Sequence, residues 1–535
     1  MVSCKRTFIP EDQYVHLFRR QISRIFCVLL FCACTASAQQ SGPPLLTYND
    51  LVALYDNDVP PPELASRLER LLTTPFINNS AGLRGPKAGA RSDFGKRFIR
   101  VATWNIERGL EFDAIKAALT NDQRFFRRLS AEARGSRFNL TEILEQAAML
   151  SRADVIVLNE ADWGLKRTDY RNVARELATA LQMNFAFGVE FVEVDPLSVG
   201  TETFEGEISA DKEEMVQNLA VDKSRTLGLH GTAILSRFPL RNVRLVPFVN
   251  QGHDWYGAEK KGVSALEKGK RKGAGIVFGE KVAREVRRGG RMMLLADIEE
   301  RSIPGGRMTV VATHLEDKAK PSERLKQLEE VLARVQPATH PVVLAGDMNT
   351  SGSDSTPTSF QREVKKRLGS SKFWVTQGIK YATGVGLLYD ITVGAVKMQR
   401  TRKDPTVKSV KFVSENPEEK FFSTLKDFRF ADGGAFDFRG AREYSVGASG
   451  ETLSDSNERA SKGFVSTLEL NGKISVALKL DWIFVKPVGL TDPDDDDQPF
   501  RFAPQFGRTL KTLNYALKDR ISDHNALIVD LPLDN

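Results

Sequence analysis

The segment Pro341-Val342-Val343-Leu344-Ala345-Gly346-Asp347-Met348-Asn349 joins an uninterrupted apolar run to two polar side chains. An apolar run of this length is typical of a buried β-strand. Side chains two positions apart on extended chain lie on the same face, so Asp347 and Asn349 are expected to leave the strand together. The segment therefore predicts a strand that presents a carboxylate and a carboxamide at one edge of a sheet.

Other polar motifs follow apolar segments in the same way. Residues 97–102 predict a strand that ends at Asn105, and residues 154–158 predict one that ends at Glu160. Further strands are expected around residues 233–235, 292–298, 308–312, 479–485 and 526–531. Polar side chains thus stand where several strands stop, and a rigid sheet would hold them at a solvent-facing edge. The motifs at these strand ends are Thr103-Trp104-Asn105, Asn159-Glu160 and Thr313-His314-Leu315. Two further polar motifs are interpreted together with them, Leu480-Asp481-Trp482 and Ser522-Asp523-His524.

Helical periodicity alternates with these strands. Apolar residues recur at helical spacing within residues 140–148, 173–181 and 325–335. Asn139 and Glu142 are the expected capping pair of the first helix, and Pro321 is expected in the first turn of the third. Many strands and few helices predict an α/β protein, a two-sheet α/β sandwich flanked by helices.

The N-terminus has the three-part order of a secretory signal peptide. Arg19, Arg20 and Arg24 precede an apolar run that ends at Cys34, and Ala36-Ser37-Ala38 follows it. We expect cleavage near Ala38 and a secreted or periplasmic protein. The run is shorter than the roughly 20 residues that span a bilayer, and no later stretch is longer, so no transmembrane segment is expected. Lipoprotein anchoring at Cys34 is the alternative.

All four cysteines lie in or before that apolar run, at positions 4, 27, 32 and 34. Cleavage after residue 38 would leave a chain without cysteine. The cleaved chain could then form neither a disulfide nor a metal site with thiolate ligands.

The domain organisation follows from shifts in composition. Residues 1–38 are the predicted signal peptide, residues 39–95 an N-terminal extension with Pro and Gly clusters, and residues 96–535 the main domain. Long insertions are expected at about 250–291 and 362–472. The segment from Trp255 to Arg291 contains eleven Lys/Arg and four Asp/Glu. This excess of positive charge has three interpretations: nucleic-acid binding, attraction to an anionic membrane surface, or a solvated charged loop. No function is assigned to the second insertion.

The polar motifs together fit metal-assisted cleavage of a phosphoester. This reaction needs a cation to neutralise charge, a base to activate water, and donors for the developing charge. Glu160 and Asp523 are hard oxygen ligands suited to Mg²⁺ or Mn²⁺. Asp347 and Asn349 can orient the attacking water. His524 is an acid/base group, and Asp481 can fix its tautomer by hydrogen bonding.

These blocks, in this order from about Phe98 to Leu531, resemble the endonuclease/exonuclease/phosphatase superfamily, the DNase I-like metal-dependent phosphoesterases. The resemblance implies a two-sheet α/β sandwich with the site residues along one edge. The chain departs from the common pattern at Asn159, where many members have glutamine. The two insertions leave substrate choice open, because loops around this edge set specificity in the family.

Carried over position by position, the resemblance implies a role for each motif residue. Asn105, Glu160 and Asp523 would hold the metal. His314 would contact the scissile phosphate. Asp347 would position or deprotonate the nucleophile, and Asn349 would bind phosphate or stabilise the transition state. His524, paired with Asp481, would complete proton transfer.

Several polar residues beside these motifs admit structural interpretations. His230 either lines the phosphate site or bonds a neighbouring turn, whereas His253 and His340 are interpreted as structural. Glu107 and Asp162 are expected to support metal ligands without binding metal themselves. Arg167 and Arg237 either meet substrate or form structural ion pairs.

The expected function is a secreted metal-dependent phosphoester hydrolase, with a phosphodiesterase or nuclease favoured. The expected substrate is a phosphoester, with nucleic acid favoured and a phospholipid or inositol phosphate as alternatives. A sphingomyelinase-like or inositol-phosphate phosphoesterase is one other hypothesis. A non-catalytic surface binding protein that keeps the fold is another. The sequence leads to no expectation about oligomeric state.

Overall fold

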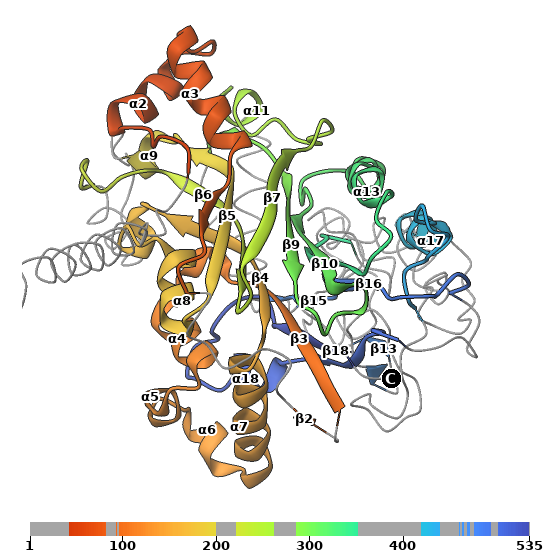
Figure 1. Cartoon of the computed structure of the whole chain (residues 1–535). Helices are drawn as coiled ribbons and strands as arrows, with labels where there is room; N and C mark the ends of the chain where they lie inside the picture. Colours follow the sequence, from red (N-terminus) through yellow and green to blue (C-terminus); the bar gives the residue numbers. More distant parts are fainter. Residues whose placement is uncertain are drawn as a thin grey trace, which may run out of the picture. The chain divides into compact units, whose positions relative to one another are not determined.

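Two β-sheets face each other across a shared apolar core in the computed structural model of the chain (Figure 1). Both belong to one compact unit, Gly42–Asn535. The predicted signal peptide and much of both expected insertions lie outside the described residues. The structure describes residues 42–81, 92–93, 96–199, 221–261, 285–350, 419–438, 459–460, 463–464, 468–470, 476–493 and 501–533.

The first sheet has nine strands among the described residues, in the order β1-β5-β6-β4-β3-β18-β17, with β2 paired to β3 and β8 paired to β5. β3 and β4 run parallel, and β18 pairs antiparallel with β3, so strands from opposite ends of the sequence lie side by side at the centre (Figure 1). The strands are β1 (Phe76–Asn78), β2 (Ser92–Asp93), β3 (Lys96–Asn105), β4 (Val155–Trp163), β5 (Asn184–Glu193), β6 (Leu229–Ser236), β8 (Arg287–Gly289), β17 (Gln505–Thr509) and β18 (Leu527–Pro532).

The second sheet has five strands among the described residues, in the order β16-β11-β10-β9-β7. β10 and β11 run parallel, while β9 and β16 pair antiparallel with them. Its strands are β7 (Leu240–Pro247), β9 (Met292–Glu299), β10 (Arg307–His314), β11 (Val342–Asp347) and β16 (Asp481–Lys486). Two short pairs are β12 (Arg459–Ala460) with β13 (Gly463–Phe464) and β14 (Leu468–Leu470) with β15 (Val476–Leu478).

Alternation along each strand divides its side chains between two cores. In β3, Ile99 and Val101 are fully buried in the cluster between the sheets, whereas Ala102 and Trp104 are buried in the cluster on the outer face. Full burial of one such aliphatic side chain contributes about 1.5–3 kcal/mol. The predicted two-sheet sandwich is therefore confirmed, and its inner core shows which residues of the central strands face the partner sheet.

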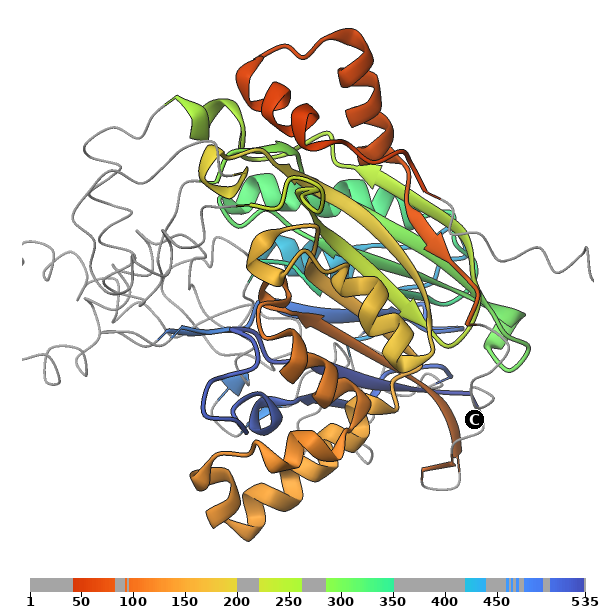
Figure 2. The ribbon, with the colours of Figure 1, turned by 90° about the vertical axis from the view of Figure 1, so that its left-hand side faces the viewer.

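Helices cover the outer faces of both sheets. Residues of α4, α7 and α8 pack with Trp104 on the first sheet, and residues of α13 and α17 pack with Trp482 on the second. In Figure 2 the red helices α2 and α3 and the orange helices α4 and α7 lie at opposite ends of the view, with strands between them. The helices are α2 (Tyr48–Asp56), α3 (Pro62–Thr73), α4 (Phe112–Thr120), α5 (Gln123–Arg127), α6 (Ala131–Gly135), α7 (Arg137–Ser151), α8 (Val173–Leu181), α9 (Pro196–Val199), α11 (Gly257–Lys260), α13 (Pro321–Val335), α17 (Glu419–Asp427) and α18 (Lys511–Asn514), with short 3₁₀ turns at Glu107–Gly109, Lys166–Thr168 and Pro304–Gly306.

Helix starts follow local capping chemistry. Pro321 stands at the first position of α13, as predicted. The start predicted for α7 was wrong: Ser136 is the N-cap, and its hydroxyl accepts a hydrogen bond from the backbone N–H of Asn139. A serine side chain three residues earlier satisfies an otherwise unpaired N–H, so the helix begins before Asn139.

Two regions expected outside the sandwich contribute to it. β1, from the expected N-terminal extension, pairs antiparallel with β5, and leucines of α2 and α3 are buried in the first outer cluster. From the second expected insertion, α17 buries Phe421 and Phe422 against the second sheet. In the described part of the chain, no helix combines the length and the apolar composition needed to cross a membrane.

Candidate active site

The alternation that builds the inner core continues into polar side chains at one edge of the sandwich. In β11, Val343 and Ala345 lie in the inner core, and Asp347 follows on the same face. The register pairs Asp347 with His314 of β10 on one side and with Asp481 of β16 on the other. In β3 and β4, alternate residues likewise face the inner core, and the last aligned pair on that face is Asn105 with Asn159. The strand-end motifs therefore meet because they share one face of two facing sheets.

Asp347 is held from three directions. Its Oδ1 accepts a hydrogen bond from the backbone N–H of Asn349 at 2.9 Å, and its Oδ2 accepts one from Nδ2 of Asn105 at 3.1 Å. Its own N–H donates to Oδ1 of Asn159 at 2.9 Å. Burial, together with the nearby carboxylate of Asp481, raises the pKa of Asp347 to about 7. Asp347 is thus a fixed carboxylate near the balance point between its protonated and ionised forms at neutral pH.

Glu160 enters the site through a bulge. The register between β4 and β6 shifts between Leu158 and Ala161, and Glu160 has a φ of 56°. Its Oε1 accepts a hydrogen bond from Nδ2 of Asn105 at 3.1 Å. Burial favours the neutral form, but the charges of His230 and Arg108 outweigh it, and the pKa of Glu160 is lowered. The bulge therefore delivers an ionised carboxylate beside Asn105.

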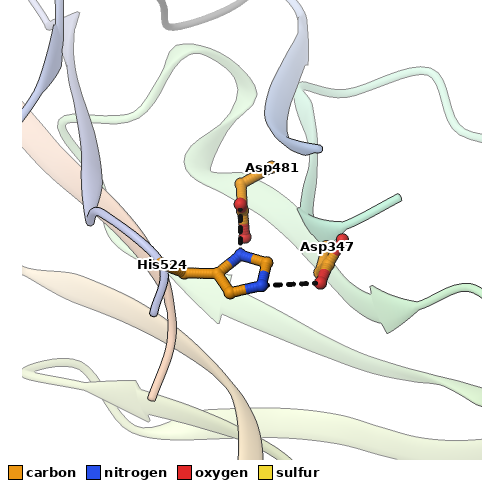
Figure 3. A group of neighbouring side chains, drawn as sticks. All are labelled: Asp347, Asp481 and His524. Carbon is orange, nitrogen blue, oxygen red and sulfur yellow. Dashed lines mark hydrogen bonds and ion pairs between the residues drawn. The ribbon is translucent and has the colours of Figure 1, made fainter. Parts of the chain in front are cut away.

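His524 and Asp481 form a hydrogen-bonded pair beside Asp347 (Figure 3). Nδ1 of His524 lies 2.7 Å from Oδ2 of Asp481, and Nε2 of His524 lies 3.7 Å from Oδ2 of Asp347. Burial alone would lower the pKa of His524, but the carboxylates of Asp481 and Asp347 raise it well above its usual value. The geometry is that of an acid/base histidine oriented by a carboxylate.

His314 approaches the same oxygen of Asp347 from the other side. Its Nε2 lies 3.6 Å from Oδ2 of Asp347, and its Nδ1 lies 2.7 Å from Nη1 of Arg291. Burial and the charge of Arg291 hold the pKa of His314 well below its usual value. The two site histidines therefore have opposite electrostatic surroundings.

The loop that carries Asp523 and His524 is fastened to β3. Nε1 of Trp104 donates to the carbonyl oxygen of His524 at 2.9 Å, and Oγ of Ser522 donates to the carbonyl oxygen of Asn105 at 2.8 Å. Trp104 thus combines core packing with support of the loop that carries His524.

Asp523 lies beside Glu107. The backbone N–H of Asp523 donates to Oε2 of Glu107 at 2.9 Å. Burial and the charges of Asp523 and Glu160 raise the pKa of Glu107 to about 7. Glu107 has a positive φ of 48°, a conformation that costs free energy and persists here because its carboxylate and N–H are both bonded.

Two sets of side chains can hold a cation. Among the described residues, the ligand atoms of Asp347, Asp481 and His524 all lie within 4.8 Å of one another. The hydrogen bond between Asp481 and His524 suits that set to proton transfer. Asn105 and Glu160, with Asp523 nearby, offer only oxygen ligands, the donors that Mg²⁺ and Mn²⁺ prefer. The donor chemistry therefore fits a divalent cation beside the proton-transfer pair.

Asn349 is fixed at the end of β11. It has a φ of 47°, and its Nδ2 donates to the carbonyl oxygen of Leu315 at 2.9 Å. Asparagine tolerates this left-handed conformation better than most residues. Its side chain, which is 5% exposed, stays at the site edge.

The remaining polar candidates are engaged in the fold. Nδ1 of His230 lies 2.8 Å from Oδ1 of Asp162, whose carboxylate also accepts two hydrogen bonds from Arg167. Arg237 donates to the carbonyl oxygens of Ala153 and Ser151. His253 bonds Glu259, and His340 bonds Thr309 and Arg307.

Arg291 contacts the candidate site through Nδ1 of His314, and the sequence did not single it out. It closes the basic insertion, where a cation is more often part of a solvated face. The nearest signal is its position directly before the predicted strand at 292–298, close to where Thr313-His314 ends the neighbouring strand.

Comparison with known proteins agrees with the motif order. The model of the Endonuclease/Exonuclease/phosphatase family matches residues 102–524. No curated protein matches the chain.

Among solved structures, an endonuclease/exonuclease/phosphatase from Beutenbergia cavernae is similar at 16% identity and a TM-score of 0.35, over 82% of this chain and 72% of that one. The human Nocturnin catalytic domain is similar at 13% identity and a TM-score of 0.31, over 81% of this chain and 93% of that one. The 3′ phosphatase NExo from Neisseria, bound to a product DNA hairpin, is similar at 12% identity and a TM-score of 0.34, over 81% of this chain and 99% of that one. The family match covers most of the chain and every motif from Asn105 to His524, and the chain therefore belongs to the endonuclease/exonuclease/phosphatase family.

Proposed function

We propose that the protein is a metal-dependent phosphodiesterase or nuclease that hydrolyses its substrate with activated water. The carrying observation is that one oxygen, Oδ2 of Asp347, lies 3.1 Å from Nδ2 of Asn105, 3.6 Å from Nε2 of His314 and 3.7 Å from Nε2 of His524. One carboxylate thus faces a side chain of the oxygen-ligand set and two histidines.

Each residue has a separate task in this proposal. Asp347 orients the attacking water and accepts its proton. His524 moves a proton at Nε2, while Asp481 keeps the proton on Nδ1. His314 and Asn349 contact the phosphate oxygens. A cation held by Asn105, Glu160 and Asp523 would neutralise phosphate charge and lower the pKa of water.

Fewer basic side chains of the insertion are available to bind a polyanionic substrate than its composition suggests. Arg287 and Arg291 form buried ion pairs with Glu193 and Glu190, and Arg288 donates to backbone carbonyls of Leu54 and Asn57. Lys260 pairs with Asp58, so four of the eleven basic residues are committed within the fold. Six others fall within residues 262–284, outside the described residues. Their number favours nucleic acid, because phosphate contacts need only lysine and arginine.

Secretion or location in the periplasm is part of the proposal. It rests on the charged, apolar and Ala36-Ser37-Ala38 segments of the N-terminus. Sequencing the N-terminus of the exported protein tests it: a first residue near Gln39 supports cleavage, and a retained Met1 contradicts it.

A turnover screen tests the activity. DNA, RNA, sphingomyelin and inositol phosphates are each incubated with the protein, with Mg²⁺, Mn²⁺ or EDTA. We expect hydrolysis of DNA or RNA that EDTA abolishes and that Asp347→Asn and His524→Ala reduce by about 10²- to 10⁴-fold.

The other outcomes separate the alternatives. Turnover of sphingomyelin or an inositol phosphate alone would move the substrate to those classes. Activity that survives both substitutions would refute the residue roles. No turnover and no cation binding by calorimetry would leave a binding protein with this fold.

A further inference from the structure

His314 and His524 flank the same oxygen of Asp347 but contact opposite kinds of partner through their second ring nitrogen. Nδ1 of His524 lies 2.7 Å from a carboxylate oxygen of Asp481. Nδ1 of His314 lies 2.7 Å from Nη1 of Arg291. A carboxylate accepts hydrogen bonds, whereas a guanidinium has five N–H donors and no acceptor.

These partners fix where each ring carries its proton. The bond with Asp481 requires a proton on Nδ1 of His524. The bond with Arg291 requires a lone pair on Nδ1 of His314, so the proton of that neutral ring stands on Nε2, toward Asp347. A second positive charge 2.7 Å from the guanidinium would be repelled in this buried place. The other charged groups around His314 are Glu190, Asp317, His230, His524 and Asp347.

Arg291 is held firmly enough to impose this arrangement. Its Nη1 also donates to Oε2 of Glu190 at 2.8 Å, and its Nη2 donates to Oδ1 of Asp317 at 3.3 Å. The residue is 3% exposed, and its guanidinium lies 5.1 Å from the ring centre of Phe191. Its carbonyl oxygen accepts hydrogen bonds from the N–H of Phe248 and from Nε2 of Gln251.

The preceding glycines allow this close approach. Gly289 has a φ of +111°, and a Cβ there would lie 2.2 Å from the carbonyl oxygen of Glu190. That same carbonyl accepts a hydrogen bond from the N–H of Gly290 at 2.8 Å. The backbone before Arg291 can therefore lie against β5, where Glu190 is located.

We propose that Arg291 is a positioning residue that keeps His314 as a neutral ring protonated on Nε2. His314 then donates a hydrogen bond to a phosphate oxygen and exchanges no proton, while Arg291 supplies the positive charge behind it. Proton transfer is left to His524. The tasks assigned to the two histidines rest on the proposed function, whereas the tautomer of His314 is independent of turnover.

Nitrogen NMR of the full chain labelled with ¹⁵N-histidine tests the tautomer directly. The chain has six histidines, and His314→Gln and His524→Gln identify the two relevant signals by their loss. We expect His314 to show the pattern of a neutral ring protonated on Nε2 and His524 to show a proton on Nδ1. A doubly protonated His314, or one protonated on Nδ1, in the wild-type protein at neutral pH would overturn the proposal.

Substitution of Arg291 tests the cause. Lysine can also only donate, so Arg291→Lys is expected to keep the Nε2-protonated pattern and part of kcat. Arg291→Gln offers an acceptor as well, and we expect a changed His314 pattern and a kcat lower by about 10²-fold, with a smaller change in KM. An unchanged pattern in Arg291→Gln would refute the role.

Arg287→Gln is the matched control. Arg287 is equally buried and is paired with Glu193, and it has no contact with His314 among the described residues. Its substitution should leave the His314 signal unchanged, and a shift as large as that in Arg291→Gln would overturn the assignment. Because the tautomer is read without turnover, the expected pattern in a protein that hydrolyses nothing would refute the proposed function and still support this inference.

Discussion

Oδ1 of Asn159 accepts a hydrogen bond at 2.9 Å from the backbone N–H of Asp347, which joins the two sheets at the site edge. Nδ2 of Asn159 completes the link, since it donates to the carbonyl oxygen of Thr313 and to Oγ1 of Thr232. Asn159 therefore fixes the backbone of Asp347 from the facing sheet, whereas Asn105 of the same sheet bonds its side chain.

We predict that Asn159→Ala lowers kcat and destabilises the protein together. The truncation removes the hydrogen bonds of a buried amide to the backbone of Asp347 and Thr313 and to Oγ1 of Thr232, at a cost of about 1–3 kcal/mol. Asn184→Ala is the control, because Asn184 is equally buried and donates to the carbonyl oxygen of Phe238 away from the site. Chemical denaturation and kcat decide the matter: equal losses of kcat in both variants would contradict a positioning role for Asn159.

Asp481→Asn should reduce kcat with little change in melting temperature. The substitution removes the charge that raises the pKa of His524. It also replaces an acceptor-only carboxylate with an amide that can donate as well as accept, so the proton on Nδ1 is no longer fixed and proton transfer should slow by about 10²- to 10⁴-fold. Asp432→Asn removes a carboxylate that pairs with Lys486 in the same sheet and should leave kcat unchanged. Steady-state kinetics would contradict the expectation if Asp481→Asn retained wild-type kcat.

Glu160→Gln should raise the Mg²⁺ or Mn²⁺ concentration needed for half-maximal activity by at least about 10-fold, because an anionic oxygen ligand is lost. Glu176→Gln, which removes a surface partner of Arg171, is the matched control. Metal titrations after EDTA treatment measure the effect. An unshifted titration curve in Glu160→Gln would place the cation elsewhere.

Acid should destabilise the fold partly through Glu285. Burial favours its neutral form, but Arg108 and Arg287 outweigh burial and lower the pKa of Glu285 to about 2. A lowered folded-state pKa contributes stability that is present above the unfolded pKa of about 4.3 and is lost as the pH falls toward 2. Glu285→Gln should therefore reduce the free energy of unfolding by about 1–3 kcal/mol at pH 7 and flatten its decline between pH 5 and 2.

Denaturant unfolding at a series of pH values measures this effect. Glu63→Gln, on the surface helix α3, serves as the control and should preserve the wild-type slope. A wild-type slope in Glu285→Gln would show that this ion pair contributes nothing to acid sensitivity.

Gly346→Ala should unfold the end of β11. Gly346 has a φ of +141°, and an added Cβ would lie 1.9 Å from the carbonyl oxygen of Thr313. Gly305→Ala provides the comparison, since Gly305 also has a positive φ but open space around it. Thermal denaturation should show the larger loss at Gly346, and equal losses would mean that backbone strain alone decides both.

The sequence predicts the parts of the fold that depend on local pattern. Apolar runs that end in polar motifs identify β3, β4, β10 and β11, and apolar runs that follow polar motifs identify β16 and β18. It does not identify β5, whose ten residues are all buried although they include Glu190 and Glu193. These glutamates are buried because Arg291 and Arg287 neutralise them, and both arginines lie about a hundred positions later in the chain.

The same distinction holds for the candidate site. The sequence places Asn105, Glu160, His314, Asp347, Asp481 and His524 at strand ends or in the last loop. Strand parity explains why four of them meet: Asn105, His314, Asp347 and Asp481. The sequence does not predict the pairing of His314 with Arg291, because nothing in a basic segment indicates which residue a particular arginine will contact. The bulge at Glu160 is equally hidden, since a positive φ at glutamate follows from the shifted register with β6.

The cross-sheet bond of Asn159 has a wider consequence. Asn105 and Glu160 belong to one sheet, and His314, Asp347 and Asp481 belong to the other. A slide of one sheet against the other would change the spacing between the proposed cation ligands on the first sheet and the proposed proton-transfer residues on the second. Substitutions that repack the inner core should therefore lower kcat before any loss of folded protein is detectable. The value of kcat would then report how well the two sheets are aligned.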